Sequence, residues 1–139
     1  KFSKISNLNV IIETSSLYHP YVLKAVEKFG TENNIKCRYF NQVTADSVHA
    51  GEVYLIINGQ LDMELIHLVR AAKSLGLKPG RDFSIISYNE APINEIILDG
   101  LTTISADFNQ MGRLAAEMIL DGNLRKVKCT FKMTRRSTF

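Results

Sequence analysis

Long apolar runs, neighbouring cysteines and glycine-rich loops are all missing from this sequence of 139 residues. No apolar run approaches the roughly 20 residues that span a bilayer, and no segment has the anatomy of a signal peptide. We therefore expect no membrane contact and a cytoplasmic location. Cys37 and Cys129 have no cysteine neighbour at metal-ligand spacing, so two buried thiols are the favoured interpretation and a disulfide is the alternative.

The usual sequence signatures of catalysis are also absent. There is no phosphate-binding glycine loop of either common spacing and no Gly-x-Ser-x-Gly turn. The histidines His19, His49 and His67 do not pair with a carboxylate at ligand spacing, which argues against zinc. Helix-turn-helix and winged-helix patterns are missing as well. We predict a protein that is not an enzyme and that holds no metal and no cofactor.

Acidic residues are missing from the end of the chain. Through Asp121 there are 11 basic and 14 acidic residues, whereas the remainder holds six basic residues and no acid. A strand predicted over 125–135 places Lys126, Lys128 and Lys132 on one face and apolar residues on the other. Because exposed lysines keep an edge strand from pairing with a neighbouring molecule, we favour that role over contact with nucleic-acid phosphates.

The sequence does contain short β-branched runs that alternate with helical periodicity, the pattern of parallel strands joined by crossover helices. The predicted fold class is therefore α/β: a doubly wound, mostly parallel sheet with helices on both faces. Strands are predicted over 8–13, 36–42, 53–58, 83–88, 101–105 and 125–135. Helices are predicted over 20–33, 61–75, 92–98 and 107–122. The polar strand 36–42 is placed near an edge and 53–58 in the centre.

Polar residues follow the predicted parallel strands, at the edge where open α/β sheets bind their ligands. The candidate ligand-binding residues are Ser15, Asn58, Tyr88, Asn89 and Glu90. Amides, hydroxyls and carboxylates suit a hydroxyl-rich ligand such as a sugar, because an amide donates and accepts at once. Helix capping and loop solvation explain the same residue types without a ligand and are the alternative interpretation.

Several short motifs stand in a fixed order in the second half of the chain. They are Leu55–Gly59, Gly76–Asp82, Ser87–Pro92, Leu101–Ile104, Met111–Glu117 and a closing Met133–Thr138. Together they resemble the effector-binding domain of lactose/galactose-repressor-type (LacI/GalR) regulators. Over about 53–138 the sequence motifs resemble those of the family. Over 8–42 only the order of the predicted strands and helices does.

That resemblance implies a type I periplasmic-binding-protein fold, in which two α/β lobes close on a small molecule. The chain has the length of one lobe and opens at Lys1 rather than Met, so we expect a fragment of a longer protein. Residues 1–139 would form the C-terminal lobe, with 101–124 as a crossover segment and helix that pack on an N-terminal lobe. A DNA-binding head, of the LacI type or of the winged-helix gluconate-repressor (GntR) type, would lie outside this chain.

The resemblance also bears on the candidate site. In the family, the positions of Asn58 and Asn89 contact the effector. Gly59 and Asn89 stand where the family has Asp, and no arginine follows the first strand, where many members place one on the ligand. We therefore expect either an effector that differs from a plain hexose or a pocket that has diverged.

Three functions remain open. The first is an effector-sensing and dimerising lobe of a bacterial transcription regulator that binds a sugar or sugar derivative. For this function, the family resemblance places the dimer interface on the helix 61–75. The alternative for that helix is that its apolar residues only pack in the core. The second is a solute-binding protein of a sugar transporter. The third is a small α/β enzyme in which Glu13, Asn58 and Glu90 converge on a cleft.

Overall fold

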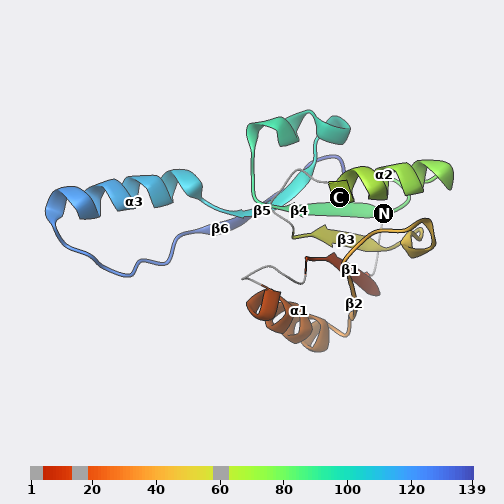
Figure 1. The fold of residues 1–139 in the computed structure, drawn as a ribbon, viewed down its shortest axis with the longest axis horizontal. Coiled ribbons are helices and arrows are strands. Elements are labelled where there is room, and N and C mark those ends of the chain that lie inside the picture. Colours follow the sequence, from red (N-terminus) through yellow and green to blue (C-terminus); the bar gives the residue numbers. More distant parts are fainter. Residues whose placement is uncertain (1–4, 14–18, 58–62) are drawn as a thin grey trace.

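The computed structural model describes residues 5–13, 19–57 and 63–139, which are organised around a six-stranded sheet (Figure 1). The strands are β1 (Asn7–Ile11), β2 (Lys36–Phe40), β3 (Val53–Ile56), β4 (Ser84–Tyr88), β5 (Thr102–Ala106) and β6 (Phe131–Thr134). Their order across the sheet is β2-β1-β3-β4-β5-β6. The first five are parallel and β6 is antiparallel to β5. The predicted mostly parallel sheet, with 36–42 at an edge and 53–58 in the interior, is confirmed.

Helices α1 (His19–Asn33) and α2 (Met63–Ser74) cover opposite faces of this sheet (Figure 1). Alternate strand residues divide between them, because successive side chains of a strand point to opposite faces. Ile11, Ile56 and Ile85 pack with Leu68 of α2, whereas the residues next to them in the strands pack on the α1 face. The strands are apolar on both faces for this reason, as expected of a parallel sheet.

The two faces are not equally well covered. Helix α1 lies against β1 and β2, and beside it a trough of about 500 Å³ runs over the neighbouring strands, with almost entirely apolar walls. Its walls include Leu55 of β3, Ile86 of β4, Ile104 of β5 and Met133 of β6. Phe29, which the helical spacing predicts to point inward, forms part of the same wall and is 46% exposed.

Helix α3 (Phe108–Asp121) projects away from the sheet at the end of an arm (Figure 1). Its predicted start is confirmed, since the Asp107 carboxylate accepts a hydrogen bond from the Gln110 amide at 3.0 Å. Gly122, in the left-handed conformation with φ of 63°, ends it. No residue of α3 is buried, although Met111, Leu114, Ala115 and Met118 give it the predicted apolar face.

The last strand is shorter than its alternating sequence predicts. Residues 123–130 are not in a strand, and β6 begins only at Phe131, opposite Ala106 at the end of β5. Residues before Phe131 therefore lie beyond the end of the only strand with which β6 pairs. Of the three lysines predicted to protect an edge strand, only Lys132 lies in the strand. Lys126 and Lys128 lie outside the sheet.

The predicted short helix over 92–98 consists of two 3₁₀ turns, η2 (Pro92–Glu95) and η3 (Ile97–Asp99), which are separated by the single residue Ile96. A third such turn, η1 (Ala45–Ser47), lies between β2 and β3. Leu98 takes a positive φ of 54°, which no continuous right-handed helix allows.

The C-terminal residues are tied back onto the sheet. The Thr138 hydroxyl accepts a hydrogen bond from the Thr102 amide at 2.8 Å and donates one to the Ile85 carbonyl at 2.9 Å. Gly80 allows this close approach, since a Cβ atom there would lie 1.9 Å from the carbonyl oxygen of Ser137. The tail therefore locks β4 and β5 together.

The predictions about the two cysteines and about membrane-spanning segments can be compared with the structure. Cys37 and Cys129 are both free thiols, and both are half-buried rather than buried as predicted, because each lies near the margin of the fold. Within the described ranges, no helix combines the length and the apolar composition needed to cross a bilayer.

Candidate functional site

The carboxyl ends of β1 to β5 lie at one edge of the sheet, because these strands are parallel. The predicted site residues follow three of these strands. Ser15 and Asn58 lie outside the described residues, so their roles stay predictions. Tyr88, Asn89 and Glu90 are described, and they occupy the end of β4 and the turn after it.

Asn89 is the residue at which the chain turns away from the sheet. Its φ of 74° is in the left-handed region, which asparagine tolerates better than most residues. The Asn89 amide still donates to the Ile104 carbonyl at 2.8 Å, and its carbonyl accepts from the Asn94 side chain at 3.4 Å. The backbone of Asn89 is thus fixed at the edge, where its side-chain amide can act as a recognition group.

Tyr88 lies on the α1 face of the sheet rather than in the turn. Its ring packs against Phe131, with ring centroids 6.1 Å apart, and forms part of the wall of the apolar trough. Packing of the ring in this trough explains the residue without a ligand. Its predicted role in ligand binding stays a prediction.

Glu90 is held by residues that are distant in sequence. Its two carboxylate oxygens accept hydrogen bonds from the Arg136 guanidinium at 2.9 and 3.2 Å, and one of them also accepts the Thr103 hydroxyl. Arg136 in addition donates to the Leu101 carbonyl at 2.9 Å. The turn after β4, the strand β5 and the C-terminal tail are therefore joined at one point.

The charge state of Glu90 follows from these contacts. Burial on its own raises the pKa of the carboxyl, but the hydrogen bonds from Arg136 and Thr103, together with the guanidinium charge, outweigh it. The pKa is held below its ordinary value of 4.5. Glu90 is therefore an ionised partner of Arg136 at neutral pH.

Beside this ion pair lies a hollow of about 490 Å³. Its walls come from the turn after β4, the end of β5, the first turn of α3 and the outer strand β6. Glu95, Asp107, Asn109 and Lys132 line it together with the Glu90–Arg136 pair. The hollow is open, and its wall combines apolar surface with these charged and polar side chains, which could contact a hydroxyl-rich ligand.

Sequence reasoning singled out Glu90 as a ligand residue but missed its partners. Thr103 and Arg136 lie 13 and 46 residues away from it along the chain. Arg136 belongs to the closing motif Met133–Thr138, which marks it as a residue of interest. The motif does not show, however, that its side chain bonds to Glu90. Only the return of the tail alongside β5 brings the guanidinium to the carboxylate.

A second carboxylate is buried at the opposite end of the sheet. Glu52, immediately before β3, is 6% exposed and accepts hydrogen bonds from the Asn7 and Asn9 amides at 2.8 and 2.7 Å. Arg38 of β2 donates to both of its oxygens, at 3.0 and 3.3 Å, and the Tyr54 hydroxyl lies at 3.3 Å. This cluster lines none of the hollows described here, so we interpret it as structural.

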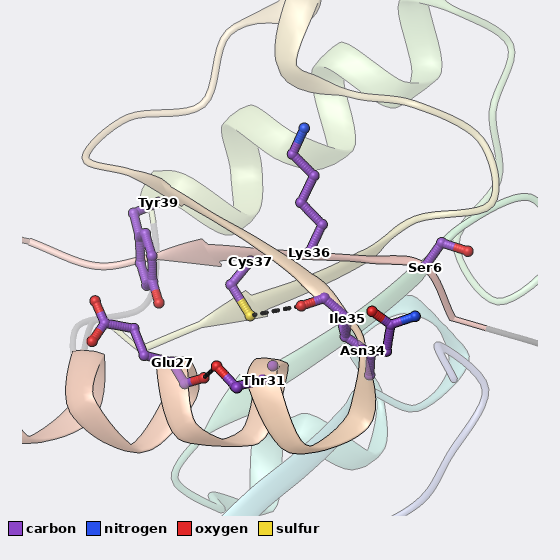
Figure 2. Close-up of a pocket in the computed structure, with 9 residues that line it drawn as sticks. Ser6, Glu27, Thr31, Asn34, Ile35, Lys36, Cys37 and Tyr39 are labelled. Atoms are coloured by element: carbon purple, nitrogen blue, oxygen red, sulfur yellow. Dashed lines mark hydrogen bonds between the residues drawn. The ribbon is translucent and has the colours of Figure 1, made fainter.

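A further groove of about 530 Å³ lies on the outer side of β2, along the end of α1 (Figure 2). Cys37 is at its centre, and its Sγ lies 3.8 Å from the Ile35 carbonyl oxygen. Burial, with a smaller contribution from the charge of Glu27, raises the pKa of this thiol, so it is not activated as a nucleophile. Among the described residues there is no group of three or more metal-ligating side chains, here or elsewhere.

Comparisons with known proteins agree with this architecture. Residues 10–128 match the model of a family described as the periplasmic binding protein-like domain. A search of curated protein sequences found no match.

Three solved structures illustrate the likeness. A LacI family transcriptional regulator from Bifidobacterium animalis subsp. lactis DSM 10140 matches with a TM-score of 0.76 and 21% identity, over 99% of this chain and 56% of that one. The Lac repressor bound to ONPG in the repressed state matches with a TM-score of 0.70 and 19% identity, over 99% and 46%. A periplasmic binding protein/LacI transcriptional regulator from Alkaliphilus metalliredigens QYMF, complexed with D-xylulofuranose, matches with a TM-score of 0.66 and 17% identity, over 99% and 57%.

At such identities the likeness establishes the fold. The chain spans only about half the length of these proteins, between 46% and 57%.

Proposed function

The chain belongs to the periplasmic binding protein-like domain family, and on that premise we propose that it is the effector-sensing and dimerising lobe of a bacterial transcription regulator. The observation that carries the proposal is the family match over residues 10–128, on a fold shared with structures named as LacI-type regulators. The effector is a small molecule, and we propose a sugar or a sugar derivative. The protein acts in the cytoplasm, and a LacI-type head outside this chain binds DNA.

Helix α3 supports the presence of a second lobe. This helix is amphipathic, yet no residue of it is buried by the described part of the chain, and two of its apolar residues, Met111 and Ile119, are 43% and 78% exposed. We propose that α3 and the arm 101–124 pack on an N-terminal lobe of the same protein. The carboxyl edge of the sheet then faces the cleft between the two lobes.

Signalling follows from this arrangement. An effector that contacts both lobes binds the closed state more tightly than the open state, and shifts the equilibrium by that difference in affinity. Closure changes the spacing of two DNA-binding heads in a dimer. In this lobe Asn89 contacts the effector, whereas Glu90, held by Arg136, fixes the turn that presents it.

Dimerisation is proposed on the outer face of α2. Leu65, Leu68 and Ala72 of this helix are buried against the sheet, while Met63 and Ile66 are 59% and 42% exposed. We expect Met63→Asp to convert dimers into monomers, because a charge there cannot be desolvated in an interface. Analytical ultracentrifugation of the full-length protein measures this. Thr31→Asp, which adds the same charge on the exposed surface of α1, is the control, and an unchanged mass for Met63→Asp contradicts the interface.

Calorimetric titration of sugars into the full-length protein tests the sensing role. We expect micromolar or tighter binding of at least one sugar by the full-length protein, and no heat above background for residues 1–139 alone, because half of the contacts would be missing. Effector-independent binding of the full-length protein to its DNA site would contradict the proposal. Micromolar binding by the isolated chain would show that the site is not shared between lobes.

A solute-binding protein of a sugar transporter is the alternative, and the xylulofuranose complex, whose name joins both classes, keeps it in view. The sequence preceding this lobe distinguishes the two, since a signal peptide favours transport and a helix-turn-helix favours regulation. The enzyme hypothesis has lost support. It supposes that Glu90 converges on a cleft with Glu13 and Asn58, whereas both oxygens of Glu90 are engaged by Arg136.

A further inference from the structure

A regular alternation of apolar and polar residues runs through 126–134, near the end of the chain. The apolar places are taken by Val127, Cys129, Phe131 and Met133, and only lysine and threonine stand between and beside them. A period of two that is kept over nine residues is typical of a strand with one covered face. Only the last four of these residues, Phe131–Thr134, form a strand in the structure.

The backbone just before β6 has no strand to pair with. Among the described residues, no backbone–backbone hydrogen bond involves residues 124–129. The ladder with β5 continues for one residue beyond β6, where the Thr130 carbonyl accepts from the Asp107 amide at 2.9 Å. It stops there because the chain turns at Asp107 into α3. Residues 124–129 thus have the sequence of a strand and a row of backbone groups without a partner in this part of the protein.

The same segment lies along α3 on the projecting arm (Figure 1). The Thr130 amide donates to the Gln110 side chain at 2.7 Å, and the Arg125 guanidinium lies 3.9 Å from the Glu117 carboxylate. These contacts join the segment to the first and the third turn of the helix. The arm therefore carries a helix and a strand-like segment beside it, which is the unit by which an α/β sheet is extended at its edge.

We propose that residues 124–130 form a strand in the full-length protein and pair with the edge strand of a sheet in the second lobe. The inference rests on the proposed function, which places α3 on that lobe, and adds the kind of surface that the lobe presents. That surface is a sheet edge with free backbone amides and carbonyls and an apolar face beside it.

A sheet edge is the partner that meets both needs of the segment. It bonds the unpaired backbone groups, and it covers Val127, which is 42% exposed, while Lys126 and Lys128 face water. The contacts with Gln110 and Glu117 keep the segment beside α3, so both reach the same lobe. The solved proteins that share the fold contain about as much chain outside the match as inside it, which is enough for a second sheet.

Hydrogen exchange of the full-length protein, resolved to single amides, tests this inference. An edge strand protects every second amide, because successive N–H groups point to opposite sides of the strand. Over 124–129 we therefore expect alternate amides to exchange at least about thirtyfold more slowly than the amides between them. Uniformly fast exchange over these residues overturns the inference.

Two neighbouring variants test which side chains the partner covers. Val127→Gln and Lys128→Gln place the same neutral residue on opposite faces of the proposed strand, and both positions are exposed in this lobe, so neither disturbs its core. Val127→Gln should speed the exchange of the protected amides by about tenfold, because an apolar contact is lost. Lys128→Gln should change it by less than about threefold. Equal effects of the two variants contradict a strand with one covered face.

Oxidation of Met111 by hydrogen peroxide separates this inference from the proposed function. Slow oxidation of Met111 in the full-length protein, together with uniformly fast exchange over 124–129, leaves a lobe on α3 and overturns the strand. Oxidation of Met111 at the rate of free methionine overturns the proposed packing of α3, and the inference falls with it. Protection that is lost on dilution assigns the partner strand to a second copy of the protein and also overturns the inference.

Discussion

The two ends of the sheet each hold a carboxylate paired with an arginine, yet the two pairs differ in their surroundings. At the amino end, Glu52 is 6% exposed and is enclosed by Arg38 and two asparagines. At the carboxyl end, the Glu90 side chain is 28% exposed and lies beside an open hollow. The same chemistry is therefore enclosed within the fold at one end and lines an open hollow at the other.

The difference follows from what each arginine connects. Arg38 of β2 reaches Glu52, just before β3, across the strand β1 that lies between them, so it ties three strands of the sheet together. Arg136 joins the turn after β4 to the C-terminal tail, which are the parts next to the proposed second lobe. A change at the amino end should thus alter stability alone, and a change at the carboxyl end should alter both stability and ligand binding.

The largest expected effect is at the closed end. Glu52→Ala removes the acceptor of Arg38, Asn7 and Asn9, and Asn9 is completely buried, so its amide is left without a partner. We expect a loss of about 3 kcal/mol in the free energy of unfolding. Urea denaturation of the full-length protein measures it. Glu52→Gln, which keeps the shape and one acceptor, should cost less than half as much, and wild-type stability in Glu52→Ala would show that the cluster contributes nothing.

A smaller loss is expected at the open end. Arg136→Met leaves the Glu90 carboxylate and the Leu101 carbonyl without their donor, at a cost of about 1–2 kcal/mol because water can reach the site in part. Its neighbour Arg135, which is exposed and packs over the ring of Phe139 at 5.3 Å, provides the matched control. Arg135→Met should cost under about 1 kcal/mol.

Effector affinity is a second property in which variants at the two ends of the sheet should differ. Arg136→Met should weaken effector binding, since the turn that carries Asn89 loses its attachment, whereas Glu52→Gln should leave the affinity unchanged. Calorimetric titration of both variants with the tightest-binding sugar measures this. Equal affinity losses in the two variants would mean that the two ends do not differ in function.

The smallest effect is the pH dependence at the open end. The pKa of Glu90 is lower in the folded protein than its ordinary value of 4.5, so the folded state favours the ionised form. This contribution is fully present above pH 4.5 and is lost as the pH falls through the lower pKa of the folded state. The difference in urea midpoint between wild type and Arg136→Met should therefore shrink below pH 4.5. A constant difference down to pH 3 would contradict the assignment.

Much of the architecture could be predicted from local pattern. The runs at Leu8–Ile12 and Val53–Ile57 are apolar on both faces, which indicated covered parallel strands before any contact was known. The helix predicted over 107–122 has the right bounds, because Asp107 and Gly122 are residue types that favour the two ends of a helix and they cap α3. The prediction was wrong where a strand needs a neighbour: residues 125–130 alternate correctly but have no strand beside them.

The candidate site divides in the same way. The amino-acid sequence by itself determined the strands and the family motifs, because both are local in the chain. Only the tertiary structure decided that Glu90 pairs with Arg136, that Glu52 is closed in by Asn9 and Arg38, and that no described residue buries the apolar face of α3. Pairings across 14 to 46 residues depend on strand order and on the path of the tail, and these are set by the packing of the whole sheet rather than by any local preference.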